Sequence, residues 1–124
     1  MMKRRVVVLG ATGSIGESTM RVARALPEQI GIIGLSGRNN SERLLELARE
    51  FPTATLCAGD EKAAKAVGEL LPGRDILHGG RGLEELASLP EADIVLIAIV
   101  GTAGLRPALK ALESGKDLAV ASKE

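Results

Sequence analysis

Three glycines near the N-terminus have the type and spacing of a phosphate-binding turn. Gly10, Gly13 and Gly16 directly follow the apolar run Val6–Leu9. In dinucleotide-binding βαβ units, a turn of this kind joins the first strand to a helix whose N-terminal N–H groups bind a pyrophosphate. Gly10 allows a tight exit from the strand, Gly13 admits a pyrophosphate close to the backbone, and Gly16 lets the helix pack closely on the sheet. The alternative is a turn that only connects strand and helix. The position of the three glycines, between an apolar strand and an amphipathic helix, favours a nucleotide site.

A basic residue stands where NAD-binding proteins usually have an acid. The loop after the second apolar run contains Arg38 and has no Asp or Glu. An acid there binds the ribose 2′-hydroxyl of NAD, whereas a guanidinium pairs with the 2′-phosphate of NADP. Ser36, Asn39 and Ser41 can donate hydrogen bonds to the same ligand. The alternative is a solvated loop that caps the next helix through Asn40 or Ser41, and both can hold together. The loop therefore predicts NADP in preference to NAD.

A third segment, Ile97–Leu105, ends a predicted strand in small residues and two more glycines. Small side chains here would let the nicotinamide half of a dinucleotide lie over the strand ends, and a plain tight turn is the alternative. The single histidine, His78, precedes three glycines and is expected on a flexible loop without metal ligands nearby. The single cysteine, Cys57, lies in an apolar run and is expected in the core. We therefore predict no metal site and no cysteine nucleophile in these residues.

Strand and helix patterns alternate along the chain, which predicts an α/β fold with a doubly wound, mostly parallel sheet of the Rossmann-like, NADP-binding kind. The expected strands are Arg5–Leu9, Ile30–Leu35, Thr53–Cys57, Asp75–His78, Asp93–Val100 and Asp117–Ala121. The expected helices are Ser14–Leu26, Ser41–Phe51, Asp60–Leu71, Leu83–Leu89 and Leu105–Ser114. Their apolar faces are expected in the core: in the first helix Ile15, Thr19, Val22 and Leu26, in the second Leu44, Leu47, Ala48 and Phe51, and in the third Ala63, Val67, Leu70 and Leu71.

Composition narrows the class of protein. The 124 residues fit one domain and carry no net charge, with one Phe and no Trp or Tyr. Zero net charge and few aromatic rings argue against a nucleic-acid partner. No apolar run has transmembrane length, and one thiol is compatible with a reducing compartment, so we expect a cytoplasmic protein without a membrane partner. The chain stops where the carboxyl edge of its last strand would bind ligands, which suggests a fragment of a longer protein.

Together these motifs resemble the N-terminal NADPH-binding domain of the 1-deoxy-D-xylulose 5-phosphate reductoisomerase family. The glycine turn Gly10–Gly16, the segment Ser36–Asn39 and the distinctive segment Ala98–Leu105 all agree with the family in order and spacing. The terminal Ala121–Glu124 resembles the family's Ala-Asn-Lys-Glu, with Ser122 in place of the Asn. Serine keeps a hydroxyl group but is shorter and lacks the amide. The resemblance spans residues 1–124 as one NADPH-binding domain.

The resemblance also implies site residues and an activity. The residues it places at NADPH are Gly10, Thr12, Gly13, Ser14, Ile15, Gly37, Arg38, Asn39, Ser122 and Glu124, and it places Lys123 at the substrate. The family converts 1-deoxy-D-xylulose 5-phosphate, a phosphosugar, to 2-C-methyl-D-erythritol 4-phosphate in non-mevalonate isoprenoid biosynthesis, using NADPH and Mg or Mn. Its metal ligands and its catalytic and C-terminal domains lie beyond the matched segment. We therefore expect no turnover by the 124 residues alone. Because the family is dimeric, we expect a homodimer for the full-length protein.

Two other functions remain compatible with the residues. One is the NADP-binding domain of another oxidoreductase with the same glycine spacing, such as an aspartate-semialdehyde dehydrogenase-like protein. Its nucleophilic cysteine would have to lie beyond residue 124, because Cys57 is badly placed for that role. The other is a non-catalytic NADP-sensing module. A short-chain reductase is disfavoured, since its Tyr-x-x-x-Lys pair needs a tyrosine and the chain has none.

Overall fold

Six parallel strands form one sheet in the computed structural model, which describes residues 3–121. The strands are β1 (Arg4–Leu9), β2 (Ile30–Gly37), β3 (Thr55–Ala58), β4 (Ile76–His78), β5 (Ile94–Ile97) and β6 (Asp117–Val120). Their order is β4-β3-β2-β1-β5-β6, and every neighbouring pair is parallel. The order reverses between β1 and β5, so the carboxyl ends of these two strands flank a topological switch point. The predicted doubly wound sheet is confirmed.

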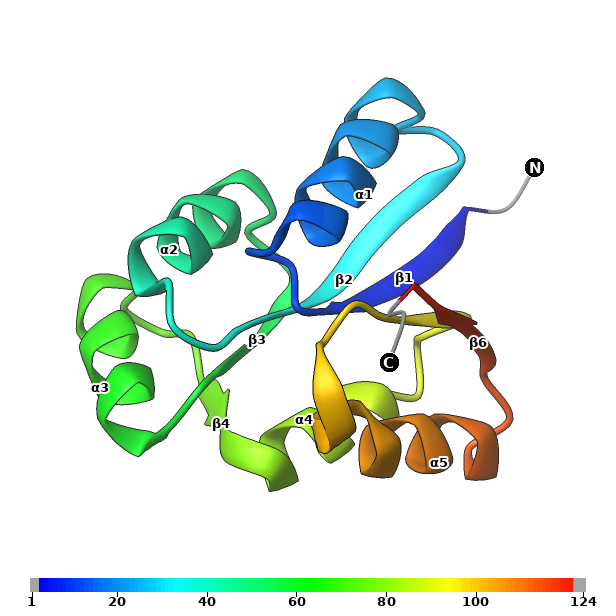
Figure 1. Cartoon of the computed structure of the whole chain (residues 1–124). Helices are drawn as coiled ribbons and strands as arrows, with labels where there is room; N and C mark the ends of the chain where they lie inside the picture. The colour runs from blue at the N-terminus through cyan, green and yellow to red at the C-terminus, as the bar shows by residue number, and fades with distance from the viewer. Residues whose placement is uncertain (1–2, 122–124) are drawn as a thin grey trace.

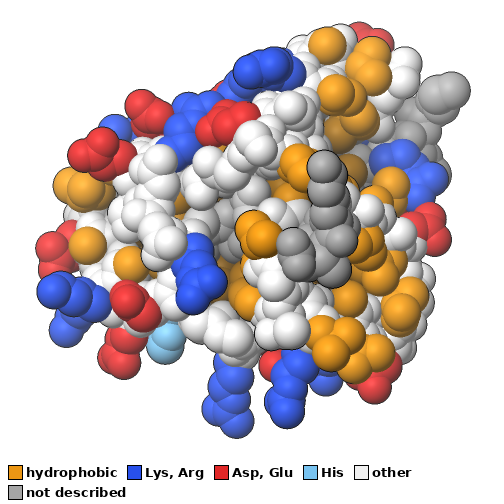
Figure 2. Space-filling view, viewed as in Figure 1, with side chains coloured by type: hydrophobic (Ala, Val, Ile, Leu, Met, Phe, Trp, Pro, Cys, Tyr) orange, Lys and Arg blue, Asp and Glu red, His pale blue; other side chains and the backbone are white. Residues whose placement is uncertain are grey.

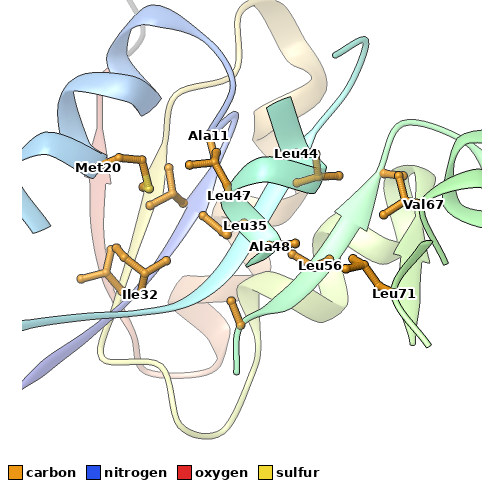
Figure 3. Close-up of a cluster of buried hydrophobic side chains, with 14 of the residues drawn as sticks. Ala11, Met20, Ile32, Leu35, Leu44, Leu47, Ala48, Leu56, Val67 and Leu71 are labelled. Atoms are coloured by element: carbon orange, nitrogen blue, oxygen red, sulfur yellow. The ribbon is translucent and has the colours of Figure 1, made fainter. Parts of the chain in front are cut away.

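Helices cover both faces of this sheet (Figure 1). The helices α1 (Ser14–Ala25), α2 (Ser41–Glu50) and α3 (Glu61–Leu70) pack on one face, and α4 (Gly79–Ala87) and α5 (Leu105–Glu113) on the other. A short 3-10 helix, η1 (Gly101–Gly104), precedes α5. Side chains alternate along β1: Val6 and Val8 enter the first layer, whereas Val7 and Leu9 enter the second. Figure 3 shows the first layer, where Met20, Leu35, Leu44, Leu47 and Leu56 are fully buried.

The sequence prediction finds the fourth helix but starts it too late, and it is wrong in placing His78 on a flexible loop. His78 ends β4 and immediately precedes α4, and the glycines that follow it form the first turns of the helix instead of a flexible loop. Gly79 has φ +67°, which glycine adopts at little cost. A Cβ atom on Gly82 would lie 2.8 Å from the Cys57 Sγ, so only a glycine lets α4 pack this closely on β3. Close packing thus overrides the low helix propensity of glycine.

The predicted core face of α1 is also wrong. Ile15, Val22 and Leu26 are 41%, 49% and 39% exposed, while the residues that face the sheet are Gly16, Met20 and Ala23. The two sets form neighbouring stripes, about 100° apart around the helix. A Cβ on Gly16 would lie 2.3 Å from the carbonyl oxygen of Gly10, so the helix meets the turn through this glycine. That contact rotates the larger apolar stripe toward solvent.

The helices α3 and α5 also carry exposed apolar side chains. Ala64 and Val67 of α3 are buried, as is Leu71 just after the helix. Leu70 was expected in the core but is exposed. In α5, Pro107 and Ala111 are buried, and Leu105, Leu109 and Leu112 are exposed. Figure 2 shows apolar side chains gathered over α1 at the upper right and over α5 and β6 at the lower right. The predicted face of α2, with Leu44, Leu47 and Ala48, is buried.

Candidate functional site

A cavity of about 770 Å³ opens at the carboxyl ends of the strands. Its walls come from the turn after β1, the loop after β2, the ends of β3 and β4, and the segment after β5. Residues from these five segments include Gly13, Arg38, Gly59, Gly80 and Ala98. The volume lies within the range typical of small-molecule sites, about 300–1,000 Å³. The cavity therefore occupies the position where open α/β sheets bind ligands.

Gly10, Gly13 and Gly16 are each glycine for a different structural reason. Gly10 has φ +90°, and a Cβ on it would lie 2.7 Å from the carbonyl oxygen of Ala98 after β5. Gly16 contacts the backbone of the turn itself, as described above. A Cβ on Gly13 would meet nothing closer than 3.7 Å. Gly10 and Gly16 are thus required by the fold, while Gly13 leaves open space beside the cavity.

The N-terminus of α1 borders this open space. Gly13 is the residue that precedes the helix, and no side chain caps it. The first N–H groups of a helix have no partner within the helix, and its dipole favours a negative charge there. The turn therefore combines an accessible backbone at Gly13 with unpaired donors in the first turn of α1, which is the arrangement that binds a phosphate.

Ser36 holds the glycine turn against the end of β2. Its side-chain oxygen accepts a hydrogen bond from the N–H of Gly10 at 2.8 Å, and its carbonyl oxygen accepts one from Ala11 at 2.8 Å. Ser36 is 4% exposed and lines the cavity. Its hydroxyl group was predicted to contact the ligand, and the structure gives it a positioning contact with the turn. Contact with a ligand stays a prediction.

Arg38 and Asn39 lie exposed on the rim of the cavity, on the loop between β2 and α2. The side-chain oxygen of Asn40 accepts a hydrogen bond from the N–H of Arg43 at 3.0 Å, which confirms that Asn40 caps α2. Gly59 follows β3, and a Cβ on it would lie 2.3 Å from the carbonyl oxygen of Arg38. The absence of this Cβ lets the chain after β3 pack directly against the Arg38 loop.

The segment after β5 forms the opposite wall. Ala98 leaves the sheet after donating its N–H to the carbonyl oxygen of Leu9 at 2.8 Å, and η1 follows. The strand therefore ends at Ile97 and not at Val100, as the sequence had suggested. Thr102 and Ala103 of η1 line the cavity. The backbone of Ala98 thus lies against Gly10 of the glycine turn across the switch point.

Comparison with known proteins decides the family. The family model described as 1-deoxy-D-xylulose 5-phosphate reductoisomerase matches residues 6–124. The chain belongs to the 1-deoxy-D-xylulose 5-phosphate reductoisomerase family. The reductoisomerase of Leptospira borgpetersenii is 43% identical over 99% of this chain and 32% of its own length, and that of Thermodesulfovibrio yellowstonii is 40% identical over 98% and 32%. The chain therefore spans about a third of the length of the curated relatives it matches.

Solved reductoisomerase structures have the same fold. A reductoisomerase in complex with magnesium superposes with a TM-score of 0.90 and 38% identity, covering 98% of this chain and 31% of that one. The enzyme from Zymomonas mobilis in complex with NADPH gives 0.87 and 35%, covering 98% and 32%. Membership of the reductoisomerase family rules out the aspartate-semialdehyde dehydrogenase-like alternative.

The structure brings most of the expected cofactor residues to one cavity. Those that line it are Gly10, Thr12, Gly13, Gly37, Arg38 and Asn39. Ser14 and Ile15 begin α1 beside the turn. Ser122, Lys123 and Glu124, which the reductoisomerase resemblance places at NADPH and substrate, lie outside the described residues.

Sequence reasoning missed the far side of the cavity. Cys57 and Gly59 at the end of β3, Gly80 and Glu84 on α4, and Arg106 on α5 also line it. The position of Gly59 directly after a strand was a usable signal, because loops at the carboxyl ends of parallel strands meet at one edge. Burial raises the pKa of the Cys57 thiol to about 12, with a smaller contribution from the negative charge of Glu85. Cys57 is therefore a neutral core residue as predicted.

Two further properties concern the described residues as a whole. Within residues 3–121, no three His, Cys, Asp or Glu side chains are grouped so that they could hold a metal ion. No helix in this part of the chain is long and apolar enough to cross a membrane.

Proposed function

We propose that this chain binds NADPH as the cofactor domain of a 1-deoxy-D-xylulose 5-phosphate reductoisomerase. The observation that carries the proposal is the shared cavity of two loops: the glycine turn with open space at Gly13, and the Arg38 loop, which has no acid. The first suits a pyrophosphate and the second a 2′-phosphate. The Zymomonas mobilis reductoisomerase, which shares the fold, is in complex with NADPH.

The cavity residues have distinct proposed roles. Gly10, Thr12, Gly13, Ser14 and Ile15 would bind the pyrophosphate and the adjoining ribose through backbone N–H groups and short side chains. Gly37, Arg38 and Asn39 would bind the adenosine 2′-phosphate, with the Arg38 guanidinium supplying the opposite charge. Ser122 and Glu124 would lie by the nicotinamide, and Lys123 would reach the substrate. When bound, NADPH supplies a hydride, and these residues orient it at the carboxyl edge of the sheet.

The whole protein would convert 1-deoxy-D-xylulose 5-phosphate to 2-C-methyl-D-erythritol 4-phosphate, as the family does. Reductoisomerase structures that share this fold contain magnesium. A Mg or Mn site in this protein would use residues beyond residue 124. By the same family resemblance, we expect the full-length protein to be a homodimer, and its composition leads us to expect a cytoplasmic one. The 124-residue chain alone would bind NADPH without turning substrate over.

Titration of the chain with NADPH and NADH, followed by calorimetry or nicotinamide fluorescence, tests the cofactor proposal. We expect tighter binding of NADPH, and we expect Arg38→Ala to weaken it about tenfold or more, because a hydrogen bond to a charged group contributes roughly 1.5–3 kcal/mol. NADH affinity should barely change, since NADH has no 2′-phosphate. Arg49→Ala, at the other end of α2 and exposed, is the matched control. Equal affinity for both nucleotides, or no binding by folded protein, would contradict the proposal.

A separate assay tests the expected inactivity. The chain is incubated with NADPH, 1-deoxy-D-xylulose 5-phosphate and Mg²⁺ or Mn²⁺, and absorbance of the nicotinamide is followed. We expect no NADPH oxidation above the blank. Metal-dependent oxidation by the pure chain would show that the 124 residues contain a complete active site.

A further inference from the structure

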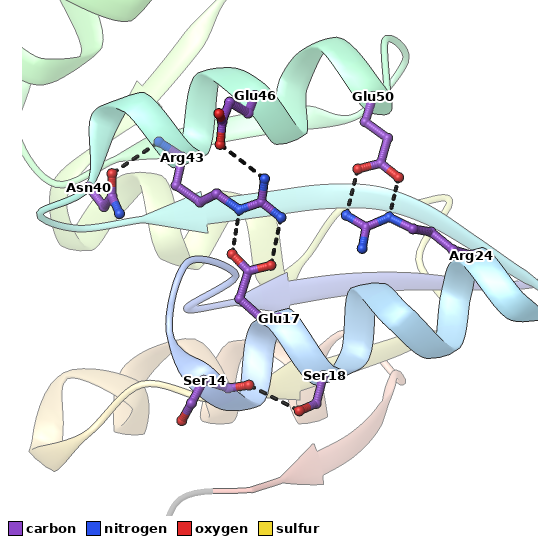
Figure 4. Close-up of polar contacts among 8 residues, drawn as sticks. All are labelled: Ser14, Glu17, Ser18, Arg24, Asn40, Arg43, Glu46 and Glu50. Atoms are coloured by element: carbon purple, nitrogen blue, oxygen red, sulfur yellow. Dashed lines mark hydrogen bonds and ion pairs between the residues drawn. The ribbon is translucent and has the colours of Figure 1, made fainter.

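Two arginine–glutamate pairs join α1 to α2, one at each end of the helices (Figure 4). Arg43 of α2 donates two hydrogen bonds to Glu17 of α1, from Nε to Oε2 at 2.5 Å and from Nη2 to Oε1 at 2.7 Å. Arg24 of α1 donates two to Glu50 of α2, one of them from Nη2 to Oε1 at 2.7 Å. The pairs have the same chemistry and join the same two helices. They differ in their distance from the cavity.

Each residue of the Arg43–Glu17 pair is hydrogen-bonded to a residue that lines the cavity. The N–H of Glu17 donates to the carbonyl oxygen of Gly13 at 2.9 Å, and the N–H of Arg43 donates to the Asn40 side chain at 3.0 Å. Gly13 and Asn40 both line the cavity. Each partner is therefore one hydrogen bond away from a different wall of the proposed nucleotide site. Figure 4 shows that the Arg24 pair lies toward the opposite ends of both helices.

The guanidinium of Arg43 is already engaged by carboxylates. Besides Glu17, it donates to Glu46 Oε1 at 3.0 Å, and the side chains of Arg43 and Glu17 are each 27% exposed. A planar guanidinium that holds both oxygens of one carboxylate restricts distance and orientation, which a single point contact does not. Arg43 would therefore act on a ligand through the elements it holds together and not by direct contact.

We propose that Arg43 is a positioning residue, which sets the spacing between the glycine turn and the Arg38 loop by holding Glu17. The spacing matters because one dinucleotide must contact both walls at once: its pyrophosphate at Gly13 and its 2′-phosphate at Arg38. This inference rests on the NADPH binding proposed above. We expect the fold to persist when the Arg43–Glu17 pair is lost, because the Arg24–Glu50 pair still joins the same two helices at their other ends.

The test compares Arg43→Ala with Arg24→Ala as a matched control, with thermal unfolding and the dissociation constants of NADPH and NADH measured for each. We expect both variants to lower the melting temperature by similar amounts, because each loses one link between α1 and α2. Only Arg43→Ala should weaken NADPH, by about tenfold, which corresponds to a binding-competent arrangement populated about one tenth of the time. NADH should weaken less, so the preference for NADPH should fall. Arg43→Lys, which keeps the charge but not the two-pronged contact, should be intermediate.

Glu17→Gln provides a second, decisive variant because two explanations predict opposite signs. Positioning by the pair predicts weaker NADPH binding, since a neutral amide holds the guanidinium less firmly. Simple electrostatics predicts tighter binding, since a negative charge is removed beside the phosphates. Tighter binding by Glu17→Gln, or an equal loss of NADPH affinity in Arg24→Ala and Arg43→Ala, would overturn the inference. Failure of the unsubstituted chain to bind NADPH would instead overturn the proposed function, and the inference with it.

Discussion

The side-chain oxygen of Ser36 accepts a hydrogen bond from the backbone N–H of Gly10 at 2.8 Å, so the end of β2 holds the turn that follows β1. The two residues are 26 positions apart in the sequence. Gly10 starts the glycine turn, and Ser36 lies two residues before Arg38. One hydrogen bond therefore joins the two loops that the proposed cofactor must bridge.

Ser36→Ala tests this contact. The substitution leaves the half-buried Gly10 N–H without its partner, and because a fully buried unpaired donor costs about 1–3 kcal/mol, we expect a loss of about 1 kcal/mol of unfolding free energy. Denaturant unfolding measures the loss. Ser18→Ala is the control, because the exposed Ser18 hydroxyl donates only to a carbonyl oxygen one turn earlier, at 3.1 Å, and its loss should cost less than about 0.5 kcal/mol. Equal stability of the two variants would show that the Ser36 contact is unimportant.

Alanine substitutions should separate the roles of the glycines. Gly16→Ala places a Cβ 2.3 Å from the Gly10 carbonyl oxygen, so we expect strong destabilisation, about 3 kcal/mol or more if the turn and helix move apart. Gly13→Ala meets nothing closer than 3.7 Å and should unfold at nearly the temperature of the unsubstituted chain. Its methyl group enters the space proposed for the pyrophosphate and should weaken NADPH binding. Thermal unfolding and NADPH titration of both variants check this split, and full NADPH affinity in a folded Gly13→Ala protein would argue against a pyrophosphate there.

The two interhelical pairs predict loss of stability in acid. The Arg43 guanidinium holds the pKa of Glu17 below its ordinary value of 4.5, and the Arg24 guanidinium does the same for Glu50. A lowered pKa in the folded state means stabilisation that is fully present above about pH 4.5, the unfolded value, and is lost as the pH falls through the folded-state pKa. Melting temperatures measured from pH 7 to pH 3 should therefore fall in the acid range. Glu50→Gln should flatten that fall, and an unchanged acid response would assign it to other carboxyl groups.

Cys57 should react slowly with thiol reagents in the folded protein. Its side chain is 1% exposed, and burial raises its pKa to about 12, so little thiolate is present at pH 8. We expect labelling to be slower by at least about a hundredfold than in denaturant, where the pKa returns to about 8.5. Timed labelling with and without urea measures the ratio. Rapid labelling without urea would mean that β3 and α4 separate readily, since Gly82 packs against this sulfur.

Much of the site was predictable because it depends on local residue types. The glycine turn, the acid-free Arg38 loop and the cap at Asn40 follow from backbone freedom, charge and short polar side chains. The parallel order of strands follows from their alternation with helices. The residues on the far side of the cavity, such as Gly59 and Gly80, were missed because their role comes from strands that meet only in the folded sheet.

The sequence by itself determined the alternation of strands and helices, the glycine turn and the basic loop, since these depend on residues close together in the chain. Tertiary structure decided which of two neighbouring stripes of α1 is buried. Both stripes carry apolar residues, and the close contact of Gly16 with the glycine turn points Met20 toward the sheet and Val22 toward solvent. It also decided that Arg43 meets Glu17, 26 residues away, because the packing of α1 and α2 on one face of the sheet brings their first turns together.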